Sequence, residues 1–171
     1  MTTLIAYGSR RGTTAEIAER IKAVLESKGI STETLPLDKV TTFQKYSVVI
    51  LGSAIYNFEW LPESQSFLHS NASALLNVPT WAFSVGCPNT APKRWNMTKE
   101  EEEPMIREQI EKELKIKGHA IFFGRFFKNH FTFVTRLAWS VMGGKYGDFT
   151  KMDEVDEWAK KVADEILALN L

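Results

Sequence analysis

Apolar and polar positions along this chain follow two alternating patterns, one typical of strands and one typical of helices. Short apolar runs of strand length lie at residues 4–7, 47–52, 78–85 and 119–124, and residues 31–37 alternate loosely in the manner of a further strand. Apolar residues recur at helical spacing at residues 14–25, 62–75, 98–117 and 153–166. Strands that alternate with helices from end to end predict an α/β fold, in which helices cover both faces of a parallel sheet.

The helix boundaries carry recognisable signals. Pro62 stands at the first position of a helix, where its missing N–H costs nothing. Thr98 is followed three residues later by Glu101, a pair that predicts a capping box. Asp153 is expected as the N-cap of the last helix, and the acidic run 100–103 is expected to be a solvated helix start.

The whole chain suits one doubly wound domain. Its 171 residues are enough for a sizeable core, and no repeat, linker or low-complexity segment divides them. We therefore expect a single domain over residues 1–171, with a five-stranded parallel sheet of order 2-1-3-4-5. In such a sheet a ligand lies beyond the carboxyl ends of the strands, where the winding reverses.

The turn after the first strand is the strongest candidate for a binding site. The strand is followed by Gly8-Ser9, two arginines and Gly12, and a helix then opens at Thr14. Such a turn directs free backbone N–H groups and the positive end of the helix dipole toward one point, which predicts a phosphate site. The lysine of a Walker loop and the three glycines of the dinucleotide fingerprint are both absent. An ordinary strand–turn–helix with polar turn residues is the alternative.

Two further turns, 53–60 and 84–89, are expected at the same edge of the sheet. The first contains Tyr56, Phe58 and Trp60, and aromatic side chains can stack on a flat ring. The second offers small residues and backbone amides. The alternative is that the aromatic side chains only cover the end of the sheet.

Charge and composition exclude several classes of function. Lys+Arg and Asp+Glu both number 21, and zero net charge argues against nucleic acid as a partner. The single cysteine, Cys87, excludes an internal disulfide. The three histidines lack partners at metal-ligand spacing, and the Gly-x-Ser-x-Gly elbow of a hydrolase is absent. The N-terminus enters a strand directly and no apolar stretch reaches ~20 residues, so we expect a cytoplasmic protein.

Residues 125–152 form an unusually long connection before the last helix. A broad apolar face rich in Phe is predicted for a helix over 126–142, with cations that include Arg125 and Arg136 around it. A basic amphipathic helix of this kind suits a membrane surface or a large apolar anion such as a porphyrin. The alternative is a helix packed on the sheet or in a dimer.

Motifs across nearly the full chain resemble a known family. They are Thr3-Leu4-Ile5, Ser9-Arg10-x-Gly12-x-Thr14, Glu16-Ile17-Ala18, Tyr46-x-Val48-Val49-Ile50, Ala54-Ile55-x-Asn57, Phe83-Ser84-Val85, Met142-x-Gly144 and Glu157-Trp158-Ala159. The chain is similar to the menaquinone-dependent protoporphyrinogen dehydrogenase branch of the flavodoxin-like family, whose long-chain members carry an insert before the last helix. This resemblance implies a flavodoxin-like three-layer sandwich with a helical insert at about 125–152, and noncovalently bound FMN.

The resemblance also implies the residues that hold FMN. The phosphate would bind to the first turn, where Arg11 replaces the usual middle Thr, at Ser9, Arg10, Arg11, Gly12, Thr13 and Thr14. The ring would lie between Ser53, Ala54, Ile55, Tyr56, Asn57 and Phe58 on one side and Ser84, Val85, Gly86 and Cys87 on the other. No catalytic residue and no metal ligand is implied.

The implied function is that of an oxidoreductase that passes electrons through FMN between a bulky substrate, such as protoporphyrinogen, and a quinone-type acceptor. A non-catalytic electron carrier that docks on a partner flavoenzyme is one alternative, and a flavin-free binding module is another. The segment 125–142 is expected to contact the quinone and the membrane surface, so that the protein would be cytoplasmic and peripheral at the membrane.

Overall fold

The computed structural model describes residues 2–86, 97–127, 137, 140–141 and 145–169. Strands and helices alternate along the chain, as the apolar pattern predicts. The elements are β1 (Thr2–Gly8), α1 (Thr13–Ser27), β2 (Ser31–Pro36), the 3-10 turn η1 (Leu37–Lys39), β3 (Val48–Tyr56), β4 (Glu59–Trp60), α2 (Pro62–Leu75), β5 (Thr80–Gly86), α3 (Lys99–Glu111), β6 (His119–Phe123), β7 (Arg125–Phe126), β8 (Gly147–Asp148) and α5 (Met152–Ala168).

The central sheet has the predicted winding. Its parallel strands follow the order β2-β1-β3-β5-β6, and β4 pairs antiparallel with β3 outside this path. Because β4 is only the return strand of a hairpin, the five parallel strands confirm the order 2-1-3-4-5. The chain reverses its winding between β1 and β3, which are hydrogen-bonded neighbours.

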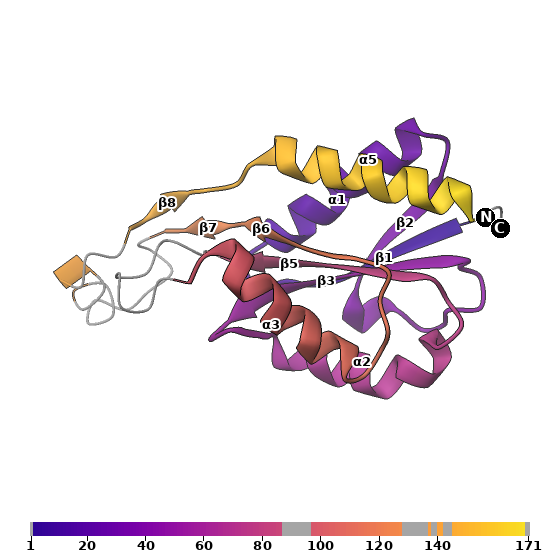
Figure 1. Ribbon diagram of the computed structural model, residues 1–171, viewed down its shortest axis with the longest axis horizontal. Helices are drawn as coiled ribbons and strands as arrows, with labels where there is room; N and C mark the ends of the chain where they lie inside the picture. The colour runs from indigo at the N-terminus through magenta and orange to yellow at the C-terminus, as the bar shows by residue number, and fades with distance from the viewer. Residues whose placement is uncertain (1, 87–96, 128–136, 138–139, 142–144, 170–171) are drawn as a thin grey trace.

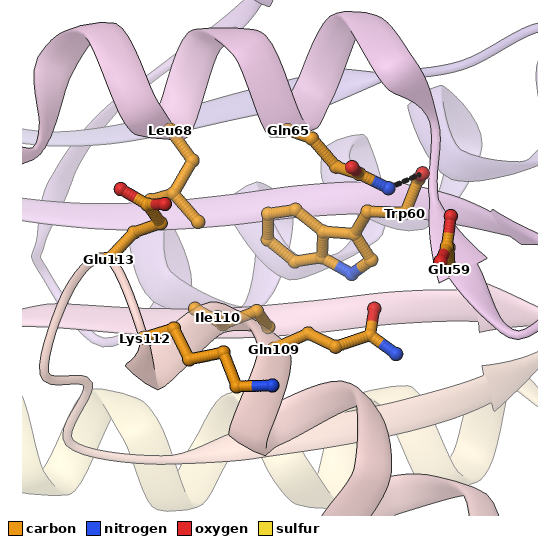
Figure 2. Close-up of a pocket in the computed structure, with 8 residues that line it drawn as sticks. All are labelled: Glu59, Trp60, Gln65, Leu68, Gln109, Ile110, Lys112 and Glu113. Carbon is orange, nitrogen blue, oxygen red and sulfur yellow. Dashed lines mark hydrogen bonds between the residues drawn. The ribbon is translucent and has the colours of Figure 1, made fainter.

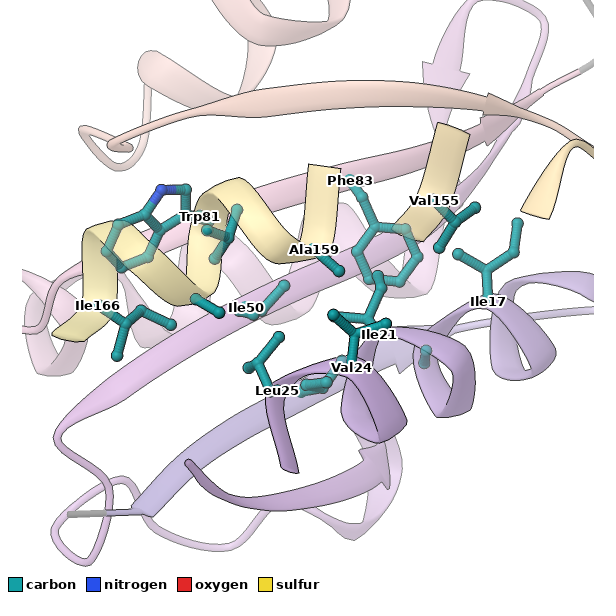
Figure 3. Packing of buried hydrophobic residues seen from close by; sticks show 14 of the residues in the cluster. Ile17, Ile21, Val24, Leu25, Ile50, Trp81, Phe83, Val155, Ala159 and Ile166 are labelled. Atoms are coloured by element: carbon teal, nitrogen blue, oxygen red, sulfur yellow. The ribbon is translucent and has the colours of Figure 1, made fainter. Parts of the chain in front are cut away.

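Helices cover both faces of the sheet, which gives the three layers of a flavodoxin-like sandwich. Figure 1 shows α1 and α5 side by side on one face and α2 and α3 on the other. The first face is packed by apolar stripes of both helices, in which Ile17, Ile21 and Val155 are fully or almost fully buried against Ile50 and Phe83 (Figure 3). Among the described residues, no helix is long and apolar enough to cross a membrane.

The sequence predicts a loop at residues 53–60, but the structure shows a β-hairpin there. β3 continues to Tyr56 and β4 turns back against it, with Ile55 opposite Trp60. The two central residues, Asn57 and Phe58, both have positive φ, of 53° and 63°. Two left-handed residues in succession are typical of the tight turn that matches the twist of a two-stranded ribbon. Asn-Phe lacks the glycine that announces such a turn, so the sequence gives little sign of it.

The sequence signals predict one of the following helix boundaries correctly and miss two others. Thr98 and Glu101 form the predicted capping box at the start of α3. The N-cap of α5 is Lys151 rather than Asp153, because the helix begins at Met152 and Asp153 lies in its first turn. α3 ends at Glu111, earlier than the predicted end at 117.

The insert begins as a strand rather than as a helix. Arg125–Phe126 forms β7, which pairs with β8 and projects beyond the carboxyl edge of the sheet (Figure 1). Phe126 stacks on Tyr146 with ring centroids 5.8 Å apart, which holds the two ends of the insert together. Leu137 and Val141 are helical and exposed, and most of the helix predicted over 126–142 lies outside the described residues.

A close contact between β3 and β5 provides a test of the packing. A Cβ added to Gly52 would lie 2.2 Å from the ring of Phe83, which is fully buried. We therefore expect Gly52→Ala to lower the free energy of unfolding by about 1–3 kcal/mol through overpacking. Urea unfolding followed by circular dichroism measures this loss. In a Phe83→Leu background the same substitution should cost clearly less, and an equal cost in both backgrounds would contradict the contact.

Candidate functional site

Three turns distant in sequence begin at neighbouring positions on the carboxyl edge of the sheet. Gly8 at the end of β1 is paired in register with Ser53 on β3, and Ser53 is paired with Ser84 on β5. The close approach of α2 leaves no room for a side chain at Gly8, where an added Cβ would lie 2.2 Å from Ser64 Oγ. The predicted convergence of the turns that follow β1 and β3 is therefore observed, and the turn after β5 starts beside them.

The turn between β1 and α1 has the geometry of an anion site. The backbone N–H of Gly12 donates to Ser9 Oγ at 3.1 Å, and Gly12 itself is left-handed with a φ of 86°. The first hydrogen bond of the helix runs from Glu16 N–H to Gly12 O at 2.9 Å. The N–H groups of Thr13, Thr14 and the next residue precede this ladder, so helical geometry gives them no acceptor within the helix. They are directed toward the turn, where the helix dipole favours negative charge.

Two arginines form the rim of this turn, whereas its threonines form the base. Arg10 and Arg11 are exposed, and Thr13 and Thr14 are buried. The guanidinium carbons of Arg10 and Arg11 lie 5.3 and 5.9 Å from the centre of the Tyr56 ring. These cation–π contacts join the turn to the hairpin, so the predicted phosphate residues and the predicted ring residues meet in space. Arg10 also forms an ion pair with Glu63 on α2 (3.5 Å).

The hairpin is held from its back and leaves part of its tip exposed. Ser53 Oγ accepts from Leu61 N–H (3.2 Å) and lies 2.9 Å from Ser64 Oγ, so this hydroxyl is used inside the protein. Gln109 on α3 donates to Phe58 O at 3.0 Å. The Phe58 side chain remains 42% exposed, and Phe58 and Tyr56 are therefore the hairpin aromatics placed to meet a ligand.

Trp60 covers the end of the sheet, which is the alternative that the sequence leaves open for the aromatic residues of this segment. It is 5% exposed, and its indole N–H donates to Ser84 Oγ at 2.7 Å. A pocket of about 200 Å³ lies over its ring between α2 and α3, with Leu68 and Ile110 among its walls (Figure 2). None of the predicted site residues lines this pocket.

The turn after β5 is described only at its start. Val85 is buried, and the carbonyl of Gly86 accepts from Gly124 N–H at 2.7 Å. Ser84 is fully buried, and its hydroxyl lies 2.8 Å from Nε2 of His119. Cys87 lies outside the described residues.

His119 and Glu103 are functional candidates that the sequence does not reveal. Nδ1 of His119 lies 3.0 Å from Glu103 Oε1, and the imidazole is completely buried. The hydrogen bond with His119 lowers the pKa of Glu103 below its usual value, against the opposing effect of burial. The acidic run 100–103 is thus not simply solvated, since Glu102 is also buried and its burial raises its pKa.

Comparison with known proteins identifies a family that covers most of the chain. The family model described as "Flavodoxin domain" matches residues 4–151. The chain belongs to this family. Flavodoxins hold FMN at the point where the winding of the sheet reverses, so the predicted cofactor is confirmed at the level of the family.

Individual relatives are distant. The chain is 26% identical over 96 residues to "Protoporphyrinogen IX dehydrogenase [quinone]" of Escherichia coli K12, a match that covers 55% of this chain and 53% of that protein. The chain thus spans about half the length of the curated relatives it matches. A flavodoxin from the domain Archaea shares the fold with a TM-score of 0.63 at 16% identity, over 97% of this chain and 99% of that one. Megasphaera elsdenii flavodoxin gives a TM-score of 0.55 at 20% identity, over 70% and 84% of the two chains.

The residues at the carboxyl edge of the sheet have the chemical groups that FMN requires for its phosphate and for its ring. A dianionic phosphate needs N–H donors and cations, which the start of α1 and the two arginines provide. The ring needs a flat apolar surface, which Tyr56 and Phe58 provide.

Arg125 connects the base of the insert to this site. Its guanidinium donates to the carboxylate of Glu16 in the first turn of α1, and its Nε donates to Asp148 Oδ2 at 2.8 Å. Hydrogen bonds from Thr150 and from Arg125 lower the pKa of Asp148 from 3.8 to about 2. One cation therefore joins the helix that follows the phosphate turn to both ends of the insert.

The pH dependence of stability tests this connection. Because the pKa of folded Asp148 lies below 3.8, its ionised form stabilises the fold above about pH 4, and this contribution is lost as the pH falls toward 2. Asp148→Asn should lower the free energy of unfolding by less than about 1 kcal/mol at neutral pH, since the pair is partly exposed. Urea unfolding at pH values from about 6 to about 3 should show the difference between wild type and variant shrinking below about pH 4.

The control is Asp38→Asn, which removes an exposed carboxylate that forms an ion pair with its sequence neighbour Lys39 at 3.4 Å. A difference for Asp148→Asn that stays constant down to about pH 3 would contradict the connection.

Proposed function

We propose that this protein is an FMN-dependent oxidoreductase that passes electrons between a bulky reduced substrate and a quinone-type acceptor. The observation that carries the proposal is the meeting of the arginine-rimmed turn with the hairpin at Tyr56. It supports an anion site and an aromatic surface side by side, as a phosphorylated flat cofactor requires.

The proposed phosphate site uses backbone donors more than hydroxyls. The N–H groups at the start of α1 bind the phosphate oxygens, and Ser9 keeps the turn closed through its bond with Gly12. Arg10 and Arg11 supply charge from the rim. Thr13 and Thr14 contribute their backbone N–H groups from the buried base of the turn, where the side chains are already held in place.

The proposed ring site lies between the hairpin and the turn after β5. Ala54, Ile55, Tyr56, Asn57 and Phe58 form one side through the hairpin, and Val85 and Gly86 begin the other through their backbone. Cys87, which lies outside the described residues, stays a prediction for this second side. Ser53 and Ser84 act indirectly, because their hydroxyls are already hydrogen-bonded within the protein. Bound FMN supplies the redox chemistry, and the protein supplies binding, orientation and shielding from water.

The substrate and acceptor are proposed from the resemblance to protoporphyrinogen IX dehydrogenase. The insert supports a contact with a large apolar partner, because Phe127, Leu137 and Val141 are 38%, 57% and 78% exposed. A cytoplasmic location with contact to the membrane surface through 125–142 is part of the proposal. An electron carrier that docks on a partner enzyme is the second candidate, favoured by full-length similarity of fold to a flavodoxin.

Titration with FMN tests the anion site. Arg11→Glu should weaken FMN binding by about tenfold or more, because a charge-assisted hydrogen bond contributes about 1.5–3 kcal/mol and the new carboxylate repels the phosphate. Quenching of flavin fluorescence on binding to the apoprotein measures the affinity. Lys22→Glu is the matched control, since Lys22 lies further along α1 and pairs with Glu26. Equal effects of the two substitutions would remove Arg11 from the site.

Turnover separates the enzyme from the carrier. The FMN-loaded protein should oxidise protoporphyrinogen with a water-soluble menaquinone analogue as acceptor, as measured by porphyrin fluorescence. Replacing residues 128–144 by a short Gly-Ser linker should abolish turnover and leave FMN binding within about threefold, because β7 and β8 already pair as a ribbon. Loss of FMN from this variant would contradict the proposed role of the insert. FMN binding without turnover by the wild type would favour the carrier.

A further inference from the structure

Four side chains from four elements form one line of hydrogen bonds behind the hairpin, and all but the last, Glu103, are buried. Trp60 on β4 donates to Ser84 on β5, Ser84 lies 2.8 Å from His119 on β6, and His119 lies 3.0 Å from Glu103 on α3. Trp60, Ser84 and the His119 imidazole are 5%, 0% and 0% exposed. We propose that His119 is a positioning residue of the flavin site, which holds Trp60 and thereby the hairpin in its binding position. The proposal rests on the proposed function, since it concerns the same hairpin.

The donors and acceptors along this line allow a direction to be assigned to each bond. An indole N–H can only donate, so Ser84 Oγ accepts from Trp60. We assign the one proton of Ser84 to the bond with Nε2 of His119, because the opposite direction would leave that proton without an acceptor among the hydrogen bonds of the described residues. Nδ1 therefore carries the hydrogen and donates to the carboxylate of Glu103. On this assignment Nδ1 of His119 carries a hydrogen and Nε2 does not, and each of these groups uses its proton once.

The arrangement resembles a Ser-His-Glu triad, but it cannot supply a nucleophile. Ser84 is fully buried, and its oxygen already accepts the indole N–H. A substrate carbonyl has no access to that oxygen. The side chains instead connect the hairpin to the body of the sheet and to α3.

The hairpin requires such a support because its turn is unfavourable. Asn57 and Phe58 are both left-handed, which is rare for a bulky residue such as Phe. Trp60 is paired with Ile55 directly behind this turn, so a displacement of the indole would move the hairpin itself. Loss of the acceptor for a buried indole N–H is costly enough to cause such a displacement.

The hydrogen positions are tested by long-range ¹H–¹⁵N NMR of the histidine ring at neutral pH. We expect hydrogen on Nδ1 of His119 and none on Nε2, and slow solvent exchange of the Trp60 indole proton. A charged ring, or hydrogen on Nε2, would overturn the proposed directions. This measurement needs no FMN, so it tests the line of hydrogen bonds separately from the proposed function. Failure of the proposed function would instead appear as wild-type protein that does not bind FMN.

The positioning role is tested with paired variants of Glu103. Glu103→Gln keeps an acceptor for the His119 N–H and should bind FMN within about threefold of wild type, whereas Glu103→Leu should bind about tenfold more weakly and shift the flavin absorption spectrum. Trp60 indole exchange should accelerate only in the Leu variant.

The matched control is His69→Gln, which removes an exposed histidine held by a similar 2.9 Å bond to Glu113. It should change neither the FMN affinity nor the indole exchange rate. Equal behaviour of Glu103→Gln and Glu103→Leu in both measurements would overturn the positioning role.

Discussion

Parallel pairing of β3 with both β1 and β5 is the constraint on which the site depends. It places Gly8, Ser53 and Ser84 at neighbouring positions although they are far apart in the sequence. A slip of β3 by one residue would turn its buried side chains to the opposite face, so the packing of both layers fixes the register. The close contact of Phe83 with the bare backbone at Gly52 adds to this constraint. With the register fixed, the arginine-rimmed turn can meet Tyr56.

The hairpin is the part of the site that local preference opposes. Two left-handed residues without glycine cost of order 1–3 kcal/mol each, and such a turn persists only where its surroundings hold it. Here the side chain of Gln109 donates a hydrogen bond to the carbonyl of Phe58, and Ser84 accepts a hydrogen bond from the indole of Trp60. A hairpin that is already held in place has little conformational entropy left to lose when a ligand binds, which favours affinity.

Much of this could be predicted because it follows from local pattern. Alternation of apolar runs gives the winding, and a strand followed by Ser9, Gly12 and a helix gives the anion turn. The hairpin could not be predicted, because Asn57 is followed by Phe58 and not by the glycine that usually completes such a turn. The His119 network could not be predicted either, since its members are brought together only by the sheet register and by α3. Tertiary contacts decide these features, and a single sequence does not display them.

The central claim is that the turn after β1 and the hairpin together bind FMN. Amide chemical-shift mapping during FMN titration of the ¹⁵N-labelled protein tests it most directly. The account predicts that the largest shifts fall on Gly12, Thr13 and Thr14 and on Tyr56 and Phe58. Shifts confined to the pocket over Trp60, at Gln65, Leu68 and Gln109, would contradict it.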